Sequence, residues 1–205
     1  GYYGAAQKIV QVLYVIPGIF AAALFPVLAR LVSQARHDDV RTLMERATAA
    51  VFLAAIPLTI GGAVLAIPIM AFLYGVAYVR GATAFQFLIA TTLLIFPGML
   101  IGNLILAYDR QKSVAWGVEL GSIGNIVFNA ILIPILGIMG AAIATIVAQF
   151  LSNGYIWHVI QKTNQFEMFS HLKKIVAAGI VMGICAGILN SFGLPVLATV
   201  FVSGI

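Results

Sequence analysis

The chain has 205 residues, of which 62% are apolar and only 8% are charged, and its mean hydropathy is +1.10. Soluble domains are about half apolar and about a quarter charged, so this composition excludes an ordinary soluble, disordered or fibrous protein. The formal charge of +5 comes from 11 Lys and Arg against 6 Asp and Glu. In so apolar a chain we interpret this excess as loop charge that sets membrane orientation, and we predict no nucleic-acid partner.

Long apolar runs in chain order predict an all-α polytopic membrane helical bundle. A membrane-spanning helix needs about 20 apolar residues, and in lipid a helix satisfies its own backbone hydrogen bonds, so we expect about six to seven transmembrane helices. We treat residues 1–205 as one transmembrane domain, with the last span cut short. The predicted spans are roughly 5–30, 47–74, 82–107, 113–136, 138–161, 172–190 and 194–205.

Basic residues gather on alternate connections between these spans. Nine of the eleven Lys and Arg lie there, namely Arg30, Arg36, Arg41, Arg46, Arg110, Lys112, Lys162, Lys173 and Lys174. Because cytoplasmic loops carry an excess of Lys and Arg, we predict that connections 31–46, 108–112 and 162–174 are cytoplasmic and that the chain lies in the inner membrane. The charged segment Arg36–Arg46 is either a short amphipathic helix on the inner surface or a solvated linker.

Prolines and small residues inside the apolar runs indicate bends and close packing. Pro17, Pro57 and Pro97 are interpreted as hinge or cavity positions, or simply as the prolines that membrane helices tolerate. Glycines at four-residue spacing occur in two spans, at Gly117 and Gly121 and at Gly179, Gly183 and Gly187. This spacing favours close helix contact. The single cysteine, Cys185, excludes an internal disulfide and any cysteine-based metal cluster.

Polar side chains inside two consecutive spans are candidate functional residues. At 100° per residue, two sets each lie on one helix face, Glu119, Ser122, Asn125 and Asn129 on the first and Thr145, Gln149, Ser152 and Asn153 on the second. An antiparallel hairpin about a turn at residues 137–140 puts Asn125 level with Gln149. The two stripes either bond to each other across the hairpin or line a wet cavity. Glu119 favours a pathway or an ion partner, because a charge in the apolar core is costly.

Two cations near the predicted outer surface have two interpretations each. Lys8 and Arg80 either reach outward to lipid headgroups or point inward as cations for an anionic substrate. Gln11 follows Lys8 by three residues on the same span. No enzyme motif or set of metal ligands occurs in the sequence, so we predict a protein that is not an enzyme and that needs no cofactor.

Three stretches, residues 1–31, 72–98 and 106–150, resemble the second half of polysaccharide flippases. The third is the most specific: it contains a short basic turn, Asn-x-x-x-Asn, and then Ile-Pro-x-x-Gly-x-x-Gly-Ala-Ala-x-Ala-Thr. In these motifs the chain is similar to the multidrug/oligosaccharidyl-lipid/polysaccharide flippase superfamily, and most similar to its polysaccharide-exporter branch, which contains the O-antigen flippases.

The resemblance implies the C-terminal lobe of a two-lobe protein that faces alternately inward and outward across a central cavity. The expected substrate is an oligosaccharide on a polyprenyl diphosphate, exported for cell-surface polysaccharide synthesis. The expected partners are this lipid-linked glycan, the membrane lipids and the missing N-terminal lobe. In such proteins, cations on the first helices of each lobe engage the anionic head, and Lys8 matches them in position.

These expectations give each candidate residue a role. Lys8 and Arg80 attract the diphosphate, and Glu119 couples transport to a proton or a sodium ion, with the membrane potential as a further possible drive. Hydrogen bonds to sugar come from Gln11, Asn125, Asn129 and Gln149. Two alternatives stay open, a multidrug cation antiporter of the same superfamily, which requires an acidic cavity, and a membrane scaffold that does not transport.

Overall fold

The computed structural model describes residues 1–166 and 172–191, and every regular element in these ranges is helical. The elements in chain order are α1 (Tyr2–Leu13), α2 (Val15–Ser33), α3 (His37–Val64), α4 (Ala66–Tyr74), the 3₁₀-helix η1 (Val76–Gly81), α5 (Ala82–Ala90), α6 (Thr92–Ala107), α7 (Gln111–Leu136), α8 (Ile138–Gln161) and α9 (Leu172–Ser191). The all-α fold class is therefore confirmed. The predicted span 194–205 lies outside the described residues.

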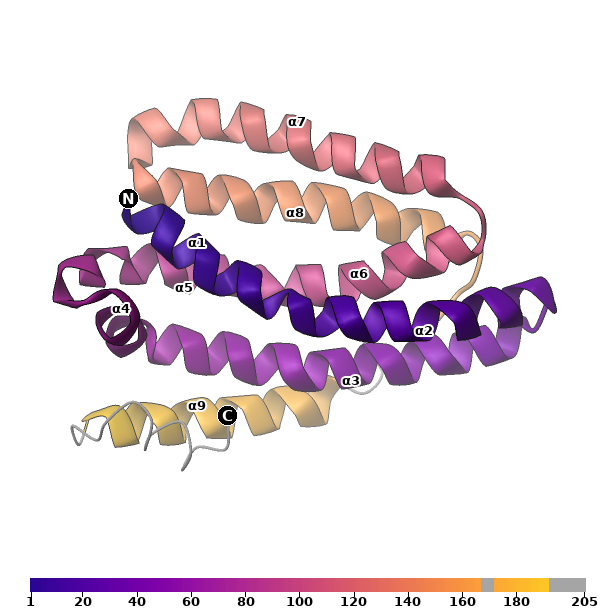
Figure 1. Ribbon diagram of the computed structural model, residues 1–205, viewed down its shortest axis with the longest axis horizontal. Helices are drawn as coiled ribbons and strands as arrows, with labels where there is room; N and C mark the ends of the chain where they lie inside the picture. Colours follow the sequence, from indigo (N-terminus) through magenta and orange to yellow (C-terminus); the bar gives the residue numbers. More distant parts are fainter. Residues whose placement is uncertain (167–171, 192–205) are drawn as a thin grey trace.

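The long helices run roughly parallel to one long axis (Figure 1). The hairpin of α7 and α8 forms one side of the bundle, and α3 with α9 forms the other. The chain segments α1–α2 and α5–α6 lie between them. Within the described ranges, five helical stretches are long and apolar enough to cross a membrane, and α9 contains a shorter apolar segment, Ile175–Ile184. The protein is a multi-pass membrane bundle.

Three of the predicted spans are interrupted by a short break in the helix. The breaks fall at Tyr14 between α1 and α2, at Leu65 between α3 and α4, and at Thr91 between α5 and α6. Tyr14 and Leu65 each lie three residues before a proline, Pro17 and Pro68. A proline ring crowds the carbonyl four residues earlier and donates no hydrogen bond, so the helix is weakened at these two places.

The break at Thr91 has a different cause. The hydroxyls of Thr91 and Thr92 donate to the carbonyls of Leu88 and Ile89 at 2.5 and 2.6 Å. Such bonds from a hydroxyl to the preceding turn compete with the backbone ladder and bend helices. In contrast, α3 and α6 continue through Pro57 and Pro97, so a hinge break at these two prolines is not what the structure shows.

The charged segment Arg36–Arg46 is neither a separate surface helix nor a linker, because α3 already begins at His37. The connection from α2 is only residues 34–36, much shorter than the predicted 31–46. Ion pairs one turn apart, Arg36–Asp39 at 2.6 Å and Arg41–Glu45 at 3.0 Å, support the first turns of α3. With 28 residues, α3 is ~42 Å long and exceeds a hydrocarbon core of ~30 Å. The charged turns are thus an extension of a spanning helix.

A polar cluster ties together three connections at one end of the bundle. The amide of Asn164, which follows α8, donates to the hydroxyl of Tyr108 at 3.1 Å and to the carbonyl of His37 at 3.3 Å. The Nδ1 atom of His37 lies 3.3 Å from the same Tyr108 hydroxyl. Asn164 lies in the segment after α8 and Tyr108 in the α6–α7 connection, and His37 is the first residue of α3, next to the α2–α3 connection. Most of the basic residues lie in or beside these regions.

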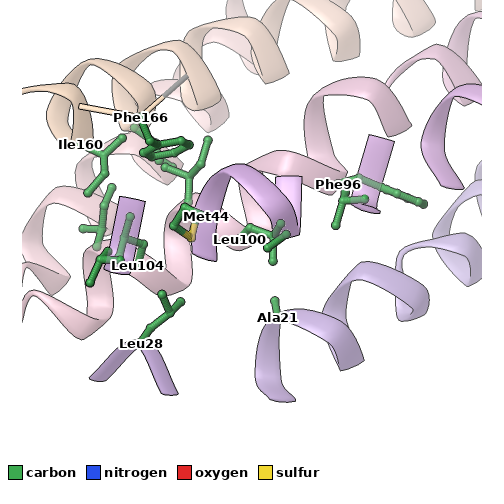
Figure 2. Close-up of a cluster of buried hydrophobic side chains, with 14 of the residues drawn as sticks. Ala21, Leu28, Met44, Phe96, Leu100, Leu104, Ile160 and Phe166 are labelled. Atoms are coloured by element: carbon green, nitrogen blue, oxygen red, sulfur yellow. The ribbon is translucent and has the colours of Figure 1, made fainter. Parts of the chain in front are cut away.

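Apolar side chains from four helices fill the centre of the bundle near this end (Figure 2). The buried residues drawn there come from α2, α3, α6, α8 and the segment after α8, namely Ala21, Leu28, Met44, Phe96, Leu100, Leu104, Ile160 and Phe166. Lipid tails are as apolar as these side chains, so dispersion contacts in a close-packed interior provide the stabilisation here.

Glycines let neighbouring helices approach closely, as their spacing predicts. A Cβ on Gly117 would lie 2.7 Å from Ile156, and one on Gly121 would lie 2.9 Å from Ser152, so α7 packs on α8 through these positions. On α9, a Cβ on Gly179 would lie 2.5 Å from the Ile56 side chain of α3. The side chain of Cys185 and the surroundings of Gly187 lie outside the described residues.

Candidate functional site

A groove lies between α7 and α8, and we call it the hairpin groove. It has a volume of about 480 Å³. Its walls are partly apolar, and its polar side chains come from both helices, namely Ser122, Asn125, Thr145, Gln149 and Ser152. Because the helices approach at glycines, short polar side chains on each side remain beside an opening. Two residues of the first predicted stripe and three of the second thus share one groove.

The polar side chains of the stripes bond mostly within their own helices. Asn129 donates to Asn125 Oδ1 at 2.8 Å, and Thr145 donates to the carbonyl of Ala141 at 2.9 Å. The hydroxyl of Tyr3, on α1, also bonds to Thr145 at 3.0 Å. Among residues 1–166 and 172–191, no side-chain hydrogen bond joins α7 to α8. The geometry therefore favours a lined groove over bonding across the hairpin.

A second groove, which we call the Tyr14 groove, borders α8 on a face next to the hairpin groove. It also has a volume of about 480 Å³ and is bordered by the α1–α2 break, α6 and α8. Its polar side chains are Tyr14, Asn103, Gln149 and Asn153, and glycines at 18, 98 and 102 form part of its wall. Apolar residues such as Met99 and Ile156 line the rest.

Gln149 borders both grooves. Its side-chain oxygen accepts a hydrogen bond of 3.1 Å from Asn153 Nδ2, which also donates to the Gln149 carbonyl at 2.9 Å. Asn153 itself rests against Gly98 of α6, where a Cβ would meet its amide oxygen. The orientation of Gln149 thus depends on a residue that is held between two helices.

One polar atom in this region is buried and has no hydrogen-bond partner. It is Oδ1 of Asn129, one turn beyond Asn125 on α7. A buried amide oxygen without a donor can accept a hydrogen bond from a water or a ligand, or coordinate a hard cation. In the described part of the chain, no three His, Cys, Asp or Glu side chains come together as a metal site.

The predicted residues Lys8, Gln11 and Arg80 lie outside both grooves. Lys8 and Gln11 are exposed on α1, and Arg80 is exposed on η1. The rings of Tyr2 and Tyr78 meet edge to face at 5.5 Å, which places η1 against the start of α1. The structure therefore brings Asn125, Asn129 and Gln149 to one region and leaves the two cations at the exposed surface near the α1–η1 contact.

Glu119 lies apart from the rest of its predicted stripe. It is exposed and borders a shallow hollow of about 410 Å³ on the outward face of α7, with Lys112 and Trp116 as neighbours. A face of one helix without a second wall is open to lipid or to another segment. The stripe thus divides into Glu119 on this face and Ser122 and Asn125 in the hairpin groove.

Two residues, Tyr14 and Asn103, were not among the predicted site residues. Both border the Tyr14 groove, and Asn103 also donates to the carbonyl of Met99 at 2.9 Å. The sequence feature that could have identified Tyr14 is its position three residues before Pro17. A proline weakens the helix just before it, and a helix break there leaves neighbouring polar groups accessible. Asn153 was assigned to a stripe without a role of its own.

A family model described as lipid II flippase MurJ matches residues 2–203, almost the whole chain. The chain belongs to this family. The lipid II flippase MurJ in an inward closed conformation has a TM-score of 0.75 with this structure at 18% sequence identity. That similarity shows the fold. No curated protein sequence matches the chain.

The MurJ match confirms the flippase superfamily that the sequence motifs indicate. MurJ is a related branch, and the polysaccharide-exporter branch is not confirmed. MurJ proteins are transporters, which supports the prediction that the chain is not an enzyme. The structural match covers 97% of this chain and 44% of the MurJ chain, so the chain spans less than half the length of that protein. This partial coverage is consistent with one lobe of a flippase.

Proposed function

We propose that the chain is the C-terminal lobe of a flippase that moves a lipid-linked precursor across the cytoplasmic membrane by alternating access. The observation that carries this proposal is the pair of grooves on either side of Gln149, in a chain of the MurJ family. Amide and hydroxyl groups beside an opening in a membrane bundle serve a polar headgroup, because elsewhere in the membrane they are costly. The other lobe supplies the facing wall of the cavity.

The proposed substrate is a glycan on a polyprenyl diphosphate, and lipid II, which the family name specifies, is the first one to test. In this proposal, Asn125, Asn129 and Gln149 donate hydrogen bonds to sugar and accept them from sugar hydroxyls. Gln11 extends this set toward the outer end of α1. A carrier for surface polysaccharide has the same diphosphate and tail, so transport of both substrates in one assay separates the two branches.

We place the end of the bundle that carries the basic connections in the cytoplasm. The α2–α3 and α6–α7 connections and residues 162–166 after α8 all lie at that end, opposite the α7–α8 turn (Figure 1). Exposed cations there, among them Arg30, Arg110 and Lys162, fit the positive-inside rule. The N-terminal end of α1 then faces the outer surface.

Lys8 is proposed to attract the diphosphate, together with Arg80. In the full-length protein, Lys8→Ala should lower flipping of a labelled lipid-linked glycan in proteoliposomes by about tenfold, because a hydrogen bond to a charged group is worth ~1.5–3 kcal/mol. Lys8→Arg should retain most of the rate. The amount of folded protein, followed by size-exclusion chromatography, should stay the same. Flipping at the normal rate by Lys8→Ala would exclude the role.

Glu119 is proposed as the coupling site for a proton or sodium ion. Glu119→Gln should make the transport rate independent of the imposed ion gradient, since the variant neither binds a proton nor provides a charge. The measurement is the rate in proteoliposomes with and without each gradient. Lys112→Gln, which alters the other charge in the same hollow, serves as the control and should keep the dependence. Unchanged ion dependence in Glu119→Gln would move the coupling site elsewhere, with Asn129 Oδ1 as the next candidate.

The alternative of a cation antiporter has less support from the site. Neither groove contains a carboxylate among its described lining residues, whereas such an antiporter requires an acidic cavity. A scaffold without transport would have apolar helix faces, and the polar linings of the two grooves argue against it.

A further inference from the structure

Two of the helix breaks are joined to each other by a hydrogen bond. The hydroxyl of Tyr14, at the α1–α2 break, lies 3.0 Å from the hydroxyl of Thr91, at the α5–α6 break. Because the Thr91 hydroxyl donates to the carbonyl of Leu88, Tyr14 is the donor in this pair. Thr91 is fully buried, so water does not replace this donor. The two interruptions are therefore held at a common level.

A neighbouring pair offers a comparison without a break on its partner helix. Thr92, next along the chain, lies 2.7 Å from the hydroxyl of Thr59, which is inside the continuous helix α3. This bond is buried, and neither residue borders a groove. Thr91 thus connects the α5–α6 break to the α1–α2 break, whereas Thr92 connects α6 to the interior of α3.

The residue that makes this bond is also part of the wall of the Tyr14 groove, which Gln149 borders as well. A phenol hydroxyl carries one hydrogen, which it gives either to Thr91 or to another acceptor. A hydroxyl or amide oxygen of a ligand in the groove therefore competes with Thr91 for the same hydrogen. Transfer of this hydrogen bond from Thr91 to a ligand takes place where the two helix breaks meet.

We propose that Tyr14 is a positioning residue that couples occupancy of the groove to the tilt of α1 and α5. In the empty groove, the bond from Tyr14 to Thr91 keeps the two outer helix segments at a common tilt. A ligand oxygen that takes the Tyr14 hydrogen releases Thr91, and α5 then tilts independently of α1. The effect of the ligand rests on the proposed function, whereas the coupling of the two breaks does not.

The coupling is tested in the full-length protein with spin labels at Thr83 and Arg110, which are exposed on either side of the α5–α6 break. Tyr14→Phe removes one hydroxyl from a different helix, yet it should shift the distance distribution between these labels. A membrane hydrogen bond of ~0.6 kcal/mol corresponds to a change of about threefold in the ratio of tilted to untilted forms. Thr91→Val should produce a similar shift, and adding Tyr14→Phe to it should produce no more. Thr91→Ser, which keeps the hydroxyl, should restore the normal distribution.

An unchanged distribution in Tyr14→Phe, or shifts that add in the double variant, would overturn the coupling. The second measurement adds lipid II to the labelled protein in lipid nanodiscs. The ligand should shift the distribution of the unmutated protein and of the control Thr59→Val, and it should leave Tyr14→Phe unchanged. No shift in a preparation that flips lipid II would overturn the ligand effect. A preparation that does not flip lipid-linked glycans would contradict the proposed function, and the measurement without ligand would still decide the coupling.

Discussion

Gly140→Ala is expected to prevent normal closure of the α7–α8 hairpin and to lower the free energy of unfolding by ~3 kcal/mol. The added Cβ would collide with the carbonyl oxygen of Leu132 and would lie 2.5 Å from its carbonyl carbon and 3.0 Å from the Ile133 nitrogen. These are backbone atoms of α7, so no change of rotamer relieves the overlap. The two helices would have to separate, and the hairpin groove would change shape with them.

The turn itself adds a second constraint. Gly137 has φ of +58° and ψ of −131°, a conformation that side chains with a Cβ rarely adopt. The chain therefore reverses at Gly137 and passes α7 closely at Gly140. Gly137 is required by the backbone conformation of the turn, and Gly140 is required by the lack of space for a Cβ.

Thermal unfolding of the purified full-length protein in detergent measures the effect. Gly154→Ala is the matched control, because Gly154 lies on the same helix and a Cβ there meets no atom within 4 Å. The control should unfold at nearly the normal temperature. Equal unfolding temperatures for Gly140→Ala and Gly154→Ala would show that the close approach at Leu132 is unimportant for stability.

Gly98→Ala is expected to reduce transport by about tenfold or more while the protein still folds. The added Cβ would collide with the amide oxygen of Asn153 and lie 2.9 Å from its Cγ. Asn153 can move, because its side chain is flexible, but it would then lose its bonds to Gln149. Small misplacements of groups that orient a substrate have large effects on rate. The prediction therefore separates transport from stability.

The matched variant is Gly102→Ala, one turn along α6 on the same groove, where a Cβ meets no atom within 4 Å. It adds the same volume to the groove without moving Asn153, and it should have a much smaller effect. Shortening Asn153 in the double variant Gly98→Ala/Asn153→Ala removes the collision. The double variant should transport no better than Asn153→Ala alone. Normal transport by Gly98→Ala in the proteoliposome assay would refute a role for the position of Asn153.

The helices and their glycine contacts were predictable because both depend on local pattern. Apolar length predicts a span whatever packs around it. Gly117 and Gly121 lie four residues apart on one face, so they meet a neighbouring helix in any compact bundle. The start of α3 was missed because charge density in Arg36–Arg46 suggests exclusion from lipid, whereas i to i+4 ion pairs and buried Val40 and Met44 continue the helix.

The helix breaks were only partly predictable. Proline removes one backbone hydrogen bond wherever it occurs, but Pro57 lies within a continuous helix and Pro68 follows a break. The difference depends on tertiary neighbours that a single sequence does not specify. The same holds for the grooves. Spacing placed Asn125 and Gln149 at one level, but their shared opening depends on how closely α7 and α8 approach.

The Asn164 cluster gives the lobe an uneven stiffness along the membrane normal. Hydrogen bonds among His37, Tyr108 and Asn164 hold the helix ends together on one side of the bilayer. Toward the other side, three spans contain the helix breaks at Tyr14, Leu65 and Thr91. Lateral pressure from lipids would therefore deform first the half of the lobe that contains the helix breaks. The lipid leaflet around that half would govern how readily the lobe changes shape.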